Sequence, residues 1–230
     1  MAYTQVNIPV SLGTTIMACK FGGGGDGDSA SGVVLCADSR TSTGAYIANK
    51  VADKISQLAE DIWICRSGSA ADTQAVTEYV RNGIRQHCSM QQRPCTVFTA
   101  AQLCQQIAYN NKSRLSAGMI VAGYDSEKGG SVYGIPLGGT LAPTESYAIG
   151  GSGSTYIYAY CEKFFPTDAP LTREGAIEFC RKAVMLATMR DGSSGGCVRM
   201  MIVDSAGSEK RFYRGNERDA YEESRPATNQ

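Results

Sequence analysis

The stretch Thr14-Thr-Ile-Met-Ala-Cys-Lys-Phe21 is apolar and β-branched, which predicts a strand buried on at least one face. The run Gly32-Val-Val-Leu-Cys-Ala-Asp-Ser-Arg40 has the same character and is expected to pair with it as a hairpin. Because Gly13 directly precedes the first strand, we hypothesise a cut between Gly13 and Thr14. The new N-terminal threonine would combine a hydroxyl nucleophile with its own base, an α-amine whose pKa is ordinarily about 8. The simpler interpretation is that these residues only begin the strand.

The rest of the chain alternates between groups of strands and pairs of helices. Further strands are expected at residues 46–48, 62–65, 118–124, 131–136, 146–149, 198–204 and 209–213. Helices are predicted to start at Ser69, at Thr99 with Gln102, and near Ser152 or Ser154, and a fourth is predicted over 172–190. The polar, glycine-rich segment 22–31 is interpreted as a mobile insertion in the first hairpin.

This order of elements indicates the fold class. Helix pairs separated by hairpin-connected strands predict an α+β fold, in which two antiparallel sheets stack face to face between outer helical layers. A doubly wound fold is not expected, since its strands and helices would alternate one by one. No linker rich in proline or serine divides the chain, so residues 14–230 are predicted to form one domain with a frayed tail at 217–230.

Composition excludes several classes of function. The chain has 22 basic and 22 acidic residues, so it has no excess charge to attract a polyanion, and nucleic acid is not expected as a partner. No run approaches the roughly 18 apolar residues of a membrane span. Neither a secretory signal pattern nor a Cys-x-x-Cys pair occurs, so we expect reduced thiols and neither a metal nor a cofactor. The cysteines expected to be buried are Cys19, Cys36, Cys65, Cys104, Cys161 and Cys180.

A hydroxyl nucleophile needs a base, an electropositive setting and a site for the oxyanion. His87 is the only histidine and is expected late in a helix, so another group has to serve as the base. Lys54 would lower the pKa of a nearby Thr14 hydroxyl, and Asp38 would hold that lysine charged and in place. Gly68 is expected to open a helix and offer its N–H to an oxyanion. The alternatives are solvated surface charges and, for Gly68, a plain strand-to-helix turn.

Two glycine- and serine-rich segments precede predicted helices or strands. They are Gly150-Gly-Ser-Gly-Ser154 and Asp191-Gly-Ser-Ser-Gly-Gly196. Such segments serve either as anion sites or as plain turns, and by themselves these two are better interpreted as turns.

Taken together, these pieces are similar to one family, the catalytic beta subunits of the proteasome, and most of all to its caspase-like, beta-one type. The resemblance runs from residue 14 to about residue 213. Its motifs are Gly13-Thr-Thr-Ile-Met-Ala18, Gly32–Arg40, Gly44-Ala-Tyr-Ile-Ala-Asn49, Asp53-Lys54, Arg66-Ser-Gly-Ser-Ala-Ala-Asp-Thr-Gln74, Ala148–Ser154 and Met189–Gly196. It implies the four-layer αββα sandwich of the N-terminal nucleophile hydrolases, which agrees with the element order.

The resemblance also implies an activity and its residues. Thr14 matches the nucleophile of a threonine endopeptidase, which forms an acyl-enzyme ester and releases it by hydrolysis. Residues 1–13 match a propeptide removed by self-cleavage at the Gly13–Thr14 bond. The remaining matches are Asp38 and Lys54 as charge partners, Gly68 as oxyanion donor, and Ser152, Asp191 and Ser194 as residues that orient the amine and its proton.

A specificity pocket is implied in the same way. Arg66 matches the arginine at the base of the pocket for the side chain before the cut, where a guanidinium would favour Asp or Glu. Thr41 and Ala70 match pocket-lining positions, and the small Ala70 keeps the pocket open. Ala52 stands where the family usually has a threonine. The alternative for Arg66 is a structural ion pair at a strand end.

The resemblance places the chain with other alpha and beta subunits in stacked heptameric rings that degrade unfolded polypeptides in the cytoplasm and nucleus. Two other interpretations compete with it. One is a non-catalytic ring subunit, although members of that kind lack the threonine or the lysine that Thr14 and Lys54 match. The other is an N-terminal nucleophile amidohydrolase acting on a small amide, against which the run Arg66–Gln74 argues.

Overall fold

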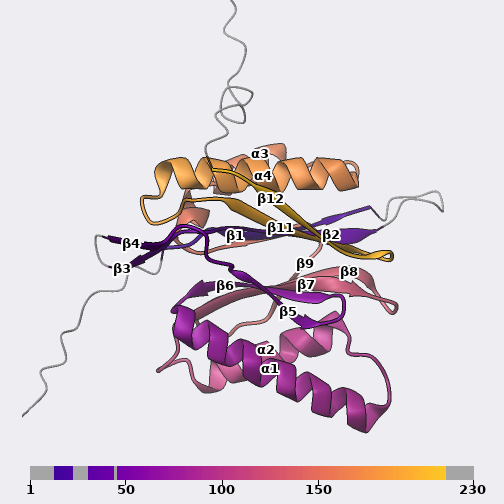
Figure 1. Ribbon diagram of the computed structural model, residues 1–230. Helices are drawn as coiled ribbons and strands as arrows, with labels where there is room; N and C mark the ends of the chain where they lie inside the picture. Colours follow the sequence, from indigo (N-terminus) through magenta and orange to yellow (C-terminus); the bar gives the residue numbers. More distant parts are fainter. Residues whose placement is uncertain (1–12, 23–30, 44–45, 216–230) are drawn as a thin grey trace, which may run out of the picture.

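The computed structural model describes residues 13–22, 31–43 and 46–215. Two five-stranded sheets, antiparallel throughout, stack face to face, and helices cover the outer face of each (Figure 1). This arrangement confirms the four-layer α+β sandwich predicted from the sequence. Residues 1–12 of the predicted propeptide, most of the glycine-rich insertion and the predicted tail lie outside the described residues.

The first sheet contains the strand that begins beside Thr14. Its order is β10-β1-β2-β11-β12, with β1 at Ile16–Phe21, β2 at Gly32–Asp38, β10 at Tyr147–Gly150, β11 at Val198–Asp204 and β12 at Gly207–Tyr213. The predicted hairpin is present, because β1 and β2 pair antiparallel from Ile16 opposite Ala37 to Phe21 opposite Gly32. As a result, the end of β2 lies beside the start of β1, and Asp38 is brought close to Thr15.

The second sheet supplies the opposite wall of the sandwich. Its order is β5-β6-β7-β8-β9, with β5 at Ile55–Ala59, β6 at Ile62–Gly68, β7 at Ala117–Asp125, β8 at Gly129–Ile135 and β9 at Ala142–Thr144. A separate two-stranded ribbon consists of β3 at Thr41–Thr43 and β4 at Tyr46–Asn49. Sequence patterning did not predict β3, β5 or β9 as strands.

The helices are α1 at Ala70–Gln91, α2 at Val97–Asn110, α3 at Tyr158–Phe164 and α4 at Arg173–Arg190. The starts of α1 and α4 were predicted correctly, and the side chains of Ser69 and Thr172 cap them. The predicted start of α2 at Thr99 was wrong, since Thr96 is the cap. The prediction of one continuous third helix from Ser152 or Ser154 was also wrong, because a 3-10 turn, η1 at Ser152–Tyr156, precedes α3.

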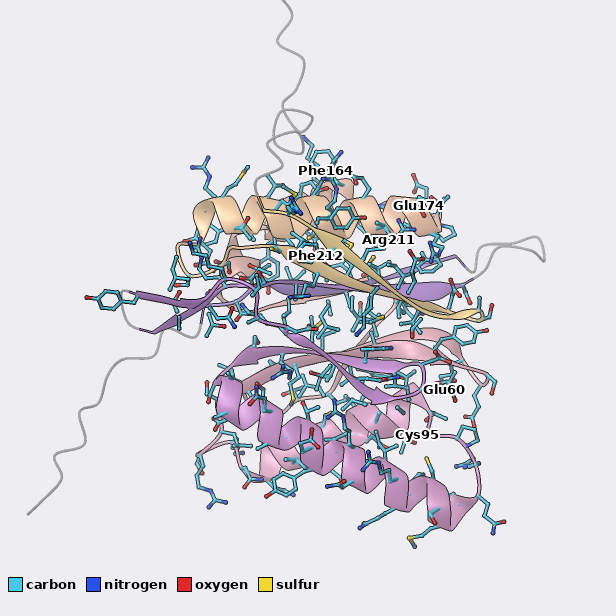
Figure 2. The ribbon with its side chains drawn as sticks, in the orientation of Figure 1. Glu60, Cys95, Phe164, Glu174, Arg211 and Phe212 are labelled. Carbon is cyan, nitrogen blue, oxygen red and sulfur yellow. The ribbon has the colours of Figure 1, made fainter. Side chains whose placement is uncertain are left out.

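Alternate residues of β1 pack against different layers, as the pleat of a strand requires. Met17 and Cys19 join the cluster that packs against α4, whereas Ile16 and Ala18 face the second sheet. A third apolar cluster joins the second sheet to α1 and α2. Figure 2 shows the side chains that fill the space between these layers. Because β1 is buried on both faces, Thr14 lies at the start of a strand that is held from both sides.

Two further observations concern the chain as a whole. All six cysteines that were expected to be buried are buried, so that prediction is confirmed. Among the described residues, no helix is both long and apolar enough to cross a membrane.

Candidate active site

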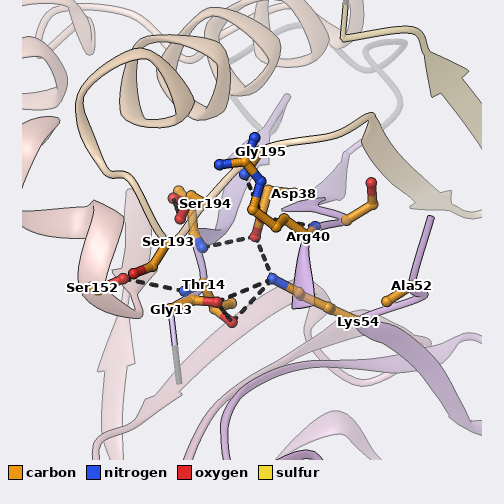
Figure 3. Close-up of polar contacts among 12 residues, drawn as sticks. Gly13, Thr14, Asp38, Arg40, Ala52, Lys54, Ser152, Ser193, Ser194 and Gly195 are labelled. Carbon is orange, nitrogen blue, oxygen red and sulfur yellow. Dashed lines mark hydrogen bonds and ion pairs between the residues drawn. The ribbon is translucent and has the colours of Figure 1, made fainter. Parts of the chain in front are cut away.

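Thr14 lies immediately before β1 and is 5% exposed. The Lys54 ammonium, which precedes β5, donates a hydrogen bond of 3.0 Å to the Thr14 hydroxyl (Figure 3). The same ammonium is 2.7 Å from an oxygen of Asp38 at the end of β2. Three different segments of the chain therefore bring a hydroxyl, a cation and an anion into successive contact.

Asp38 is fully buried and holds more than the lysine. One carboxylate oxygen also accepts the Thr15 amide at 2.9 Å, and the other accepts the Gly195 amide at 2.9 Å. Burial lowers the pKa of Lys54 from its ordinary value, and Asp38 opposes that shift. Since a buried charge requires a partner, Asp38 keeps a positive charge next to the threonine hydroxyl.

The nitrogen of Thr14 faces a second set of polar groups. It donates to the Ser152 hydroxyl at 3.2 Å, and Ser152 in turn donates to Asp191 at 2.6 Å. Ser194 also donates to Asp191 at 2.6 Å. Burial alone would raise the pKa of Asp191, but the hydrogen bonds from Ser152 and Ser194 outweigh it and the pKa lies below its ordinary value. Asp191 therefore remains an anion that orients both serines.

Close approach to the backbone of Thr14 requires glycine at residue 151. Gly151 has a φ of 82°, and a Cβ there would lie 2.0 Å from the Thr14 carbonyl oxygen. The next glycine, Gly153, donates its amide to that carbonyl at 3.2 Å. The turn between β10 and η1 thus packs directly on Thr14 and positions Ser152.

The bond that precedes Thr14 is held within the same group of residues. The Thr14 hydroxyl lies 2.7 Å from the Gly13 carbonyl oxygen, and the Lys54 ammonium lies 3.5 Å from it. A Cβ at Gly13 would lie only 1.7 Å from the Cβ of Ser193. Glycine is therefore the residue that fits before Thr14.

Gly68 does not open a helix, which corrects the sequence prediction. It is the last residue of β6, it has a φ of 96°, and Ser69 rather than Gly68 caps α1. The left-handed backbone there favours glycine, since a Cβ would lie 2.3 Å from the Ser116 carbonyl oxygen. Gly68 nevertheless lies beside Thr14, because both line the same cavity.

That cavity has a volume of about 320 Å³ and brings together all four residues predicted for substrate binding. They are Thr41, Ala52, Arg66 and Ala70. One guanidinium nitrogen of Arg66 donates to the Asp53 carbonyl at 2.8 Å, while its Nε is buried without a partner among the described residues. Burial lowers the pKa of Arg66 from its ordinary value. A carboxylate that entered this cavity would be attracted by the positive charge of the Arg66 guanidinium. We call this cavity the Arg66 pocket.

Sequence reasoning missed several residues that complete the site. They are Thr15, whose hydroxyl pairs with Ser194 at 2.9 Å; Gly195, which donates to Asp38; Ser193, which packs on Gly13; and Arg40, which lines the Arg66 pocket. Residues 191–196 were better interpreted as a plain turn from local pattern alone. The structure brings that turn against Asp38 and Gly13 instead. In the described part of the chain, no group of three or more His, Cys, Asp or Glu side chains is placed to hold a metal ion.

A family model described as proteasome subunit matches residues 10–203 of the chain. Among similar proteins is proteasome subunit beta type-6 of Arabidopsis thaliana, 46% identical over 219 residues, which cover 95% of this chain and 89% of the relative. The beta type-6 subunit of Dictyostelium discoideum is 50% identical over 208 residues, covering 90% and 92%. Proteasome subunit beta type-1 of Saccharomyces cerevisiae is 47% identical over 204 residues, covering 89% of each chain.

Proposed function

The chain belongs to the proteasome subunit family as a beta-type subunit, and we propose that it is a threonine endopeptidase of the core particle with Thr14 as nucleophile. The observation that carries the proposal is the 3.0 Å hydrogen bond from the buried Lys54 ammonium to the Thr14 hydroxyl. A non-catalytic subunit has no need of a buried cation there, and the arrangement costs desolvation energy that Asp38 has to offset.

Self-cleavage comes first in the proposed sequence of events. The Thr14 Oγ attacks the Gly13 carbonyl carbon, the bond to the Thr14 nitrogen breaks, and that nitrogen takes up a proton as an amine. Water then hydrolyses the resulting ester, which leaves a carboxylate on Gly13 and a free Thr14. The 2.7 Å contact of the hydroxyl with the Gly13 carbonyl oxygen and the nearby Lys54 support this step.

Peptide hydrolysis repeats the chemistry on a substrate. The free α-amine of Thr14, oriented by Ser152, accepts the hydroxyl proton as Oγ attacks the substrate carbonyl. Lys54 stabilises the developing negative charge on Oγ, and the Gly68 N–H is proposed to bind the oxyanion. The amine then gives its proton to the leaving nitrogen. An acyl ester on Thr14 remains, and water releases it.

We propose that the Arg66 pocket selects acidic side chains before the cut, as in the caspase-like, beta-one type. The position of Arg66 in the cavity wall supports this preference, because its guanidinium would attract a substrate carboxylate and can donate charge-assisted hydrogen bonds to it. Thr41, Ala52 and Ala70 shape the pocket. The small Ala52 and Ala70 leave room for the longer glutamate side chain.

As a proteasome beta subunit, the chain assembles with other proteasome subunits. We propose that its partners are the alpha and beta subunits of stacked heptameric rings, that its substrates are unfolded polypeptides, and that it works in the cytoplasm and nucleus. Family membership supports the assembly with other proteasome subunits.

The test uses assembled particles that contain Thr14→Ala or Thr14→Ser in this chain. We expect Thr14→Ala to keep residues 1–13 attached and to abolish cleavage after acidic residues, while Thr14→Ser, which retains a hydroxyl, keeps both reactions in part. Processing and full cleavage in the Thr14→Ala particle would refute Thr14 as the nucleophile. Inactive particles with an unaltered Thr14 would favour the non-catalytic subunit instead.

A further inference from the structure

A second and larger cavity adjoins the Arg66 pocket. It has a volume of about 740 Å³ and opens between β1 and β10 of one sheet and β7 and β8 of the other. Gly68 lines both cavities, but Ser152 lines only this one and Arg66 lines only the other. We call it the Gly134 cavity, after a glycine in its wall.

The proton path decides which half of a substrate each cavity receives. In the proposed reaction the Thr14 amine protonates the leaving nitrogen, so that nitrogen has to depart past the amine. The Thr14 nitrogen is hydrogen-bonded to Ser152 (Figure 3). Ser152 also lies in the wall of the Gly134 cavity. The acyl half then occupies the Arg66 pocket, and the leaving half occupies the Gly134 cavity.

We propose that the Gly134 cavity binds the substrate residues that follow the scissile bond and favours apolar side chains there. This inference rests on the proposed peptidase function and adds a second specificity to it. The walls are mainly apolar and include Ile16, Ile120, Ile135, Leu137 and Ala148. Burial of an apolar side chain against such walls removes area from water and stabilises the bound substrate.

Charge in this cavity disfavours acidic residues after the cut. Glu162 is the only charged residue among those that line it, and its carboxylate accepts a hydrogen bond of 2.6 Å from Tyr147. No cation lines the cavity to pair with a substrate carboxylate. An acidic side chain there would lose water, gain no ion pair and lie near a like charge.

Gly134 in β8 offers a way to narrow the cavity without strain. Its φ lies outside the left-handed region, and the nearest atoms to a Cβ there would be those of Ala142 and Ala148 at 3.7–3.9 Å, which is ordinary contact. Both alanines also line the cavity, so a larger side chain at residue 134 occupies space that a substrate would use. Gly138 is a matched control, because it lines neither cavity and a Cβ there meets nothing within 4 Å.

The experiment compares two peptides that are identical up to a glutamate and continue with either Leu-Leu or Gly-Gly. Assembled particles carry the unaltered chain, Gly134→Val, Leu137→Ala or Gly138→Val, and mass spectrometry measures cleavage at the glutamate. Particles with Thr14→Ala give the background from other subunits. Leu137 is 56% exposed at the cavity wall, so Leu137→Ala tests the cavity even where Gly134→Val prevents assembly.

With the unaltered chain we expect kcat/KM for the Leu-Leu peptide to exceed that for the Gly-Gly peptide by roughly tenfold. Gly134→Val should bring this ratio close to one, Leu137→Ala should lower it several-fold, and Gly138→Val should preserve it. A ratio near one with the unaltered chain, or a ratio unchanged in both cavity variants, would overturn the assignment of the cavity. No cleavage of either peptide by the unaltered chain would overturn the proposed function and this inference with it.

Discussion

The two cavities near Thr14 differ in chemistry although they share Gly68 in their walls. The Arg66 pocket is lined by the charged side chains of Arg40, Asp53, Lys54 and Arg66, whereas the Gly134 cavity has Glu162 as its single charged lining residue. Thr14 turns its hydroxyl toward Lys54 and its nitrogen toward Ser152. If the proposed assignments hold, the difference teaches that one threonine serves two binding regions, of which one would select by charge and the other by buried apolar area.

Removal of Lys54 should slow the cleavage of all peptides by the same factor, whatever side chains flank the scissile bond, because Lys54 acts on the Thr14 hydroxyl and not on either cavity's specificity. We expect Lys54→Ala to lower kcat by at least about a hundredfold, since the charge that stabilises the attacking oxygen is lost. Steady-state cleavage of acidic and non-acidic peptides measures the effect. Lys50→Ala is the control, as Lys50 is exposed and lines neither cavity. Full turnover in Lys54→Ala would remove Lys54 from the chemistry.

A side chain at residue 13 should block self-cleavage, because the space beside Gly13 is occupied by Ser193. A Cβ at Gly13 would lie 1.7 Å from the Cβ of Ser193 and 2.8 Å from its Cα. We expect Gly13→Ala to leave most chains uncut, as seen from the mass of the subunit after assembly. The double variant Gly13→Ala with Ser193→Gly should recover part of the cutting, because the shorter contact is gone and the longer one remains. Normal cutting in Gly13→Ala alone would contradict the packing argument.

Loss of Arg66 should change one cavity and leave the other unaffected. A hydrogen bond to a charged group contributes about 1.5–3 kcal/mol. We therefore expect Arg66→Ala to lower kcat/KM after glutamate by roughly tenfold to a hundredfold, while the Leu-Leu to Gly-Gly preference persists. Arg85→Ala, an exposed arginine of α1, is the matched control. An equal loss for acidic and neutral peptides would assign Arg66 a structural role.

The smallest expected effect is the dependence of kcat/KM on pH, which tests the protonation of the Thr14 amine and of Lys54. The Thr14 amine, with a pKa ordinarily about 7.7–8.0, has to be unprotonated, so activity should rise with pH on the acid side. Lys54 has to be charged, and burial lowers its pKa. As pH rises, activity should therefore fall again, and this fall should begin before the pH reaches the ordinary lysine pKa of about 10.4. A profile of kcat/KM from pH 6 to about pH 10.5 measures both limbs. A rate that still rises at the alkaline end would contradict the charged role of Lys54.

Sequence patterning predicted the central strands well because their burial is written into consecutive residues. Every residue of β2 is buried, and a continuous apolar run is typical of such a strand. The start of α2 was placed three residues late because Thr96 and Thr99 are both plausible caps. The helix begins at Val97, whose amide donates a hydrogen bond to the distant Asp125, and no local pattern reveals that contact.

The site was predicted in the same uneven way. Strand ends, helped by the family resemblance, indicated Asp38, Lys54 and Arg66, which occupy the expected surroundings of Thr14. The turn at 191–196 looked ordinary by local pattern, and only the family resemblance indicated Asp191 and Ser194. Its partner is distant, since the Gly195 amide bonds Asp38 across 157 residues. The Gly134 cavity had no sequence signal at all, since it arises only where two sheets meet.

The intact mass of this subunit, purified within its native particle, tests the central claim most directly. We predict a mass that corresponds to a chain beginning at Thr14, because the hydroxyl, Lys54 and the Gly13 carbonyl are already arranged for self-cleavage. A mass that includes residues 1–13 in a fully assembled particle would mean that the Thr14 nitrogen remains an amide. The proposed base would then not exist, and the account of Thr14 as a catalytic nucleophile would be contradicted.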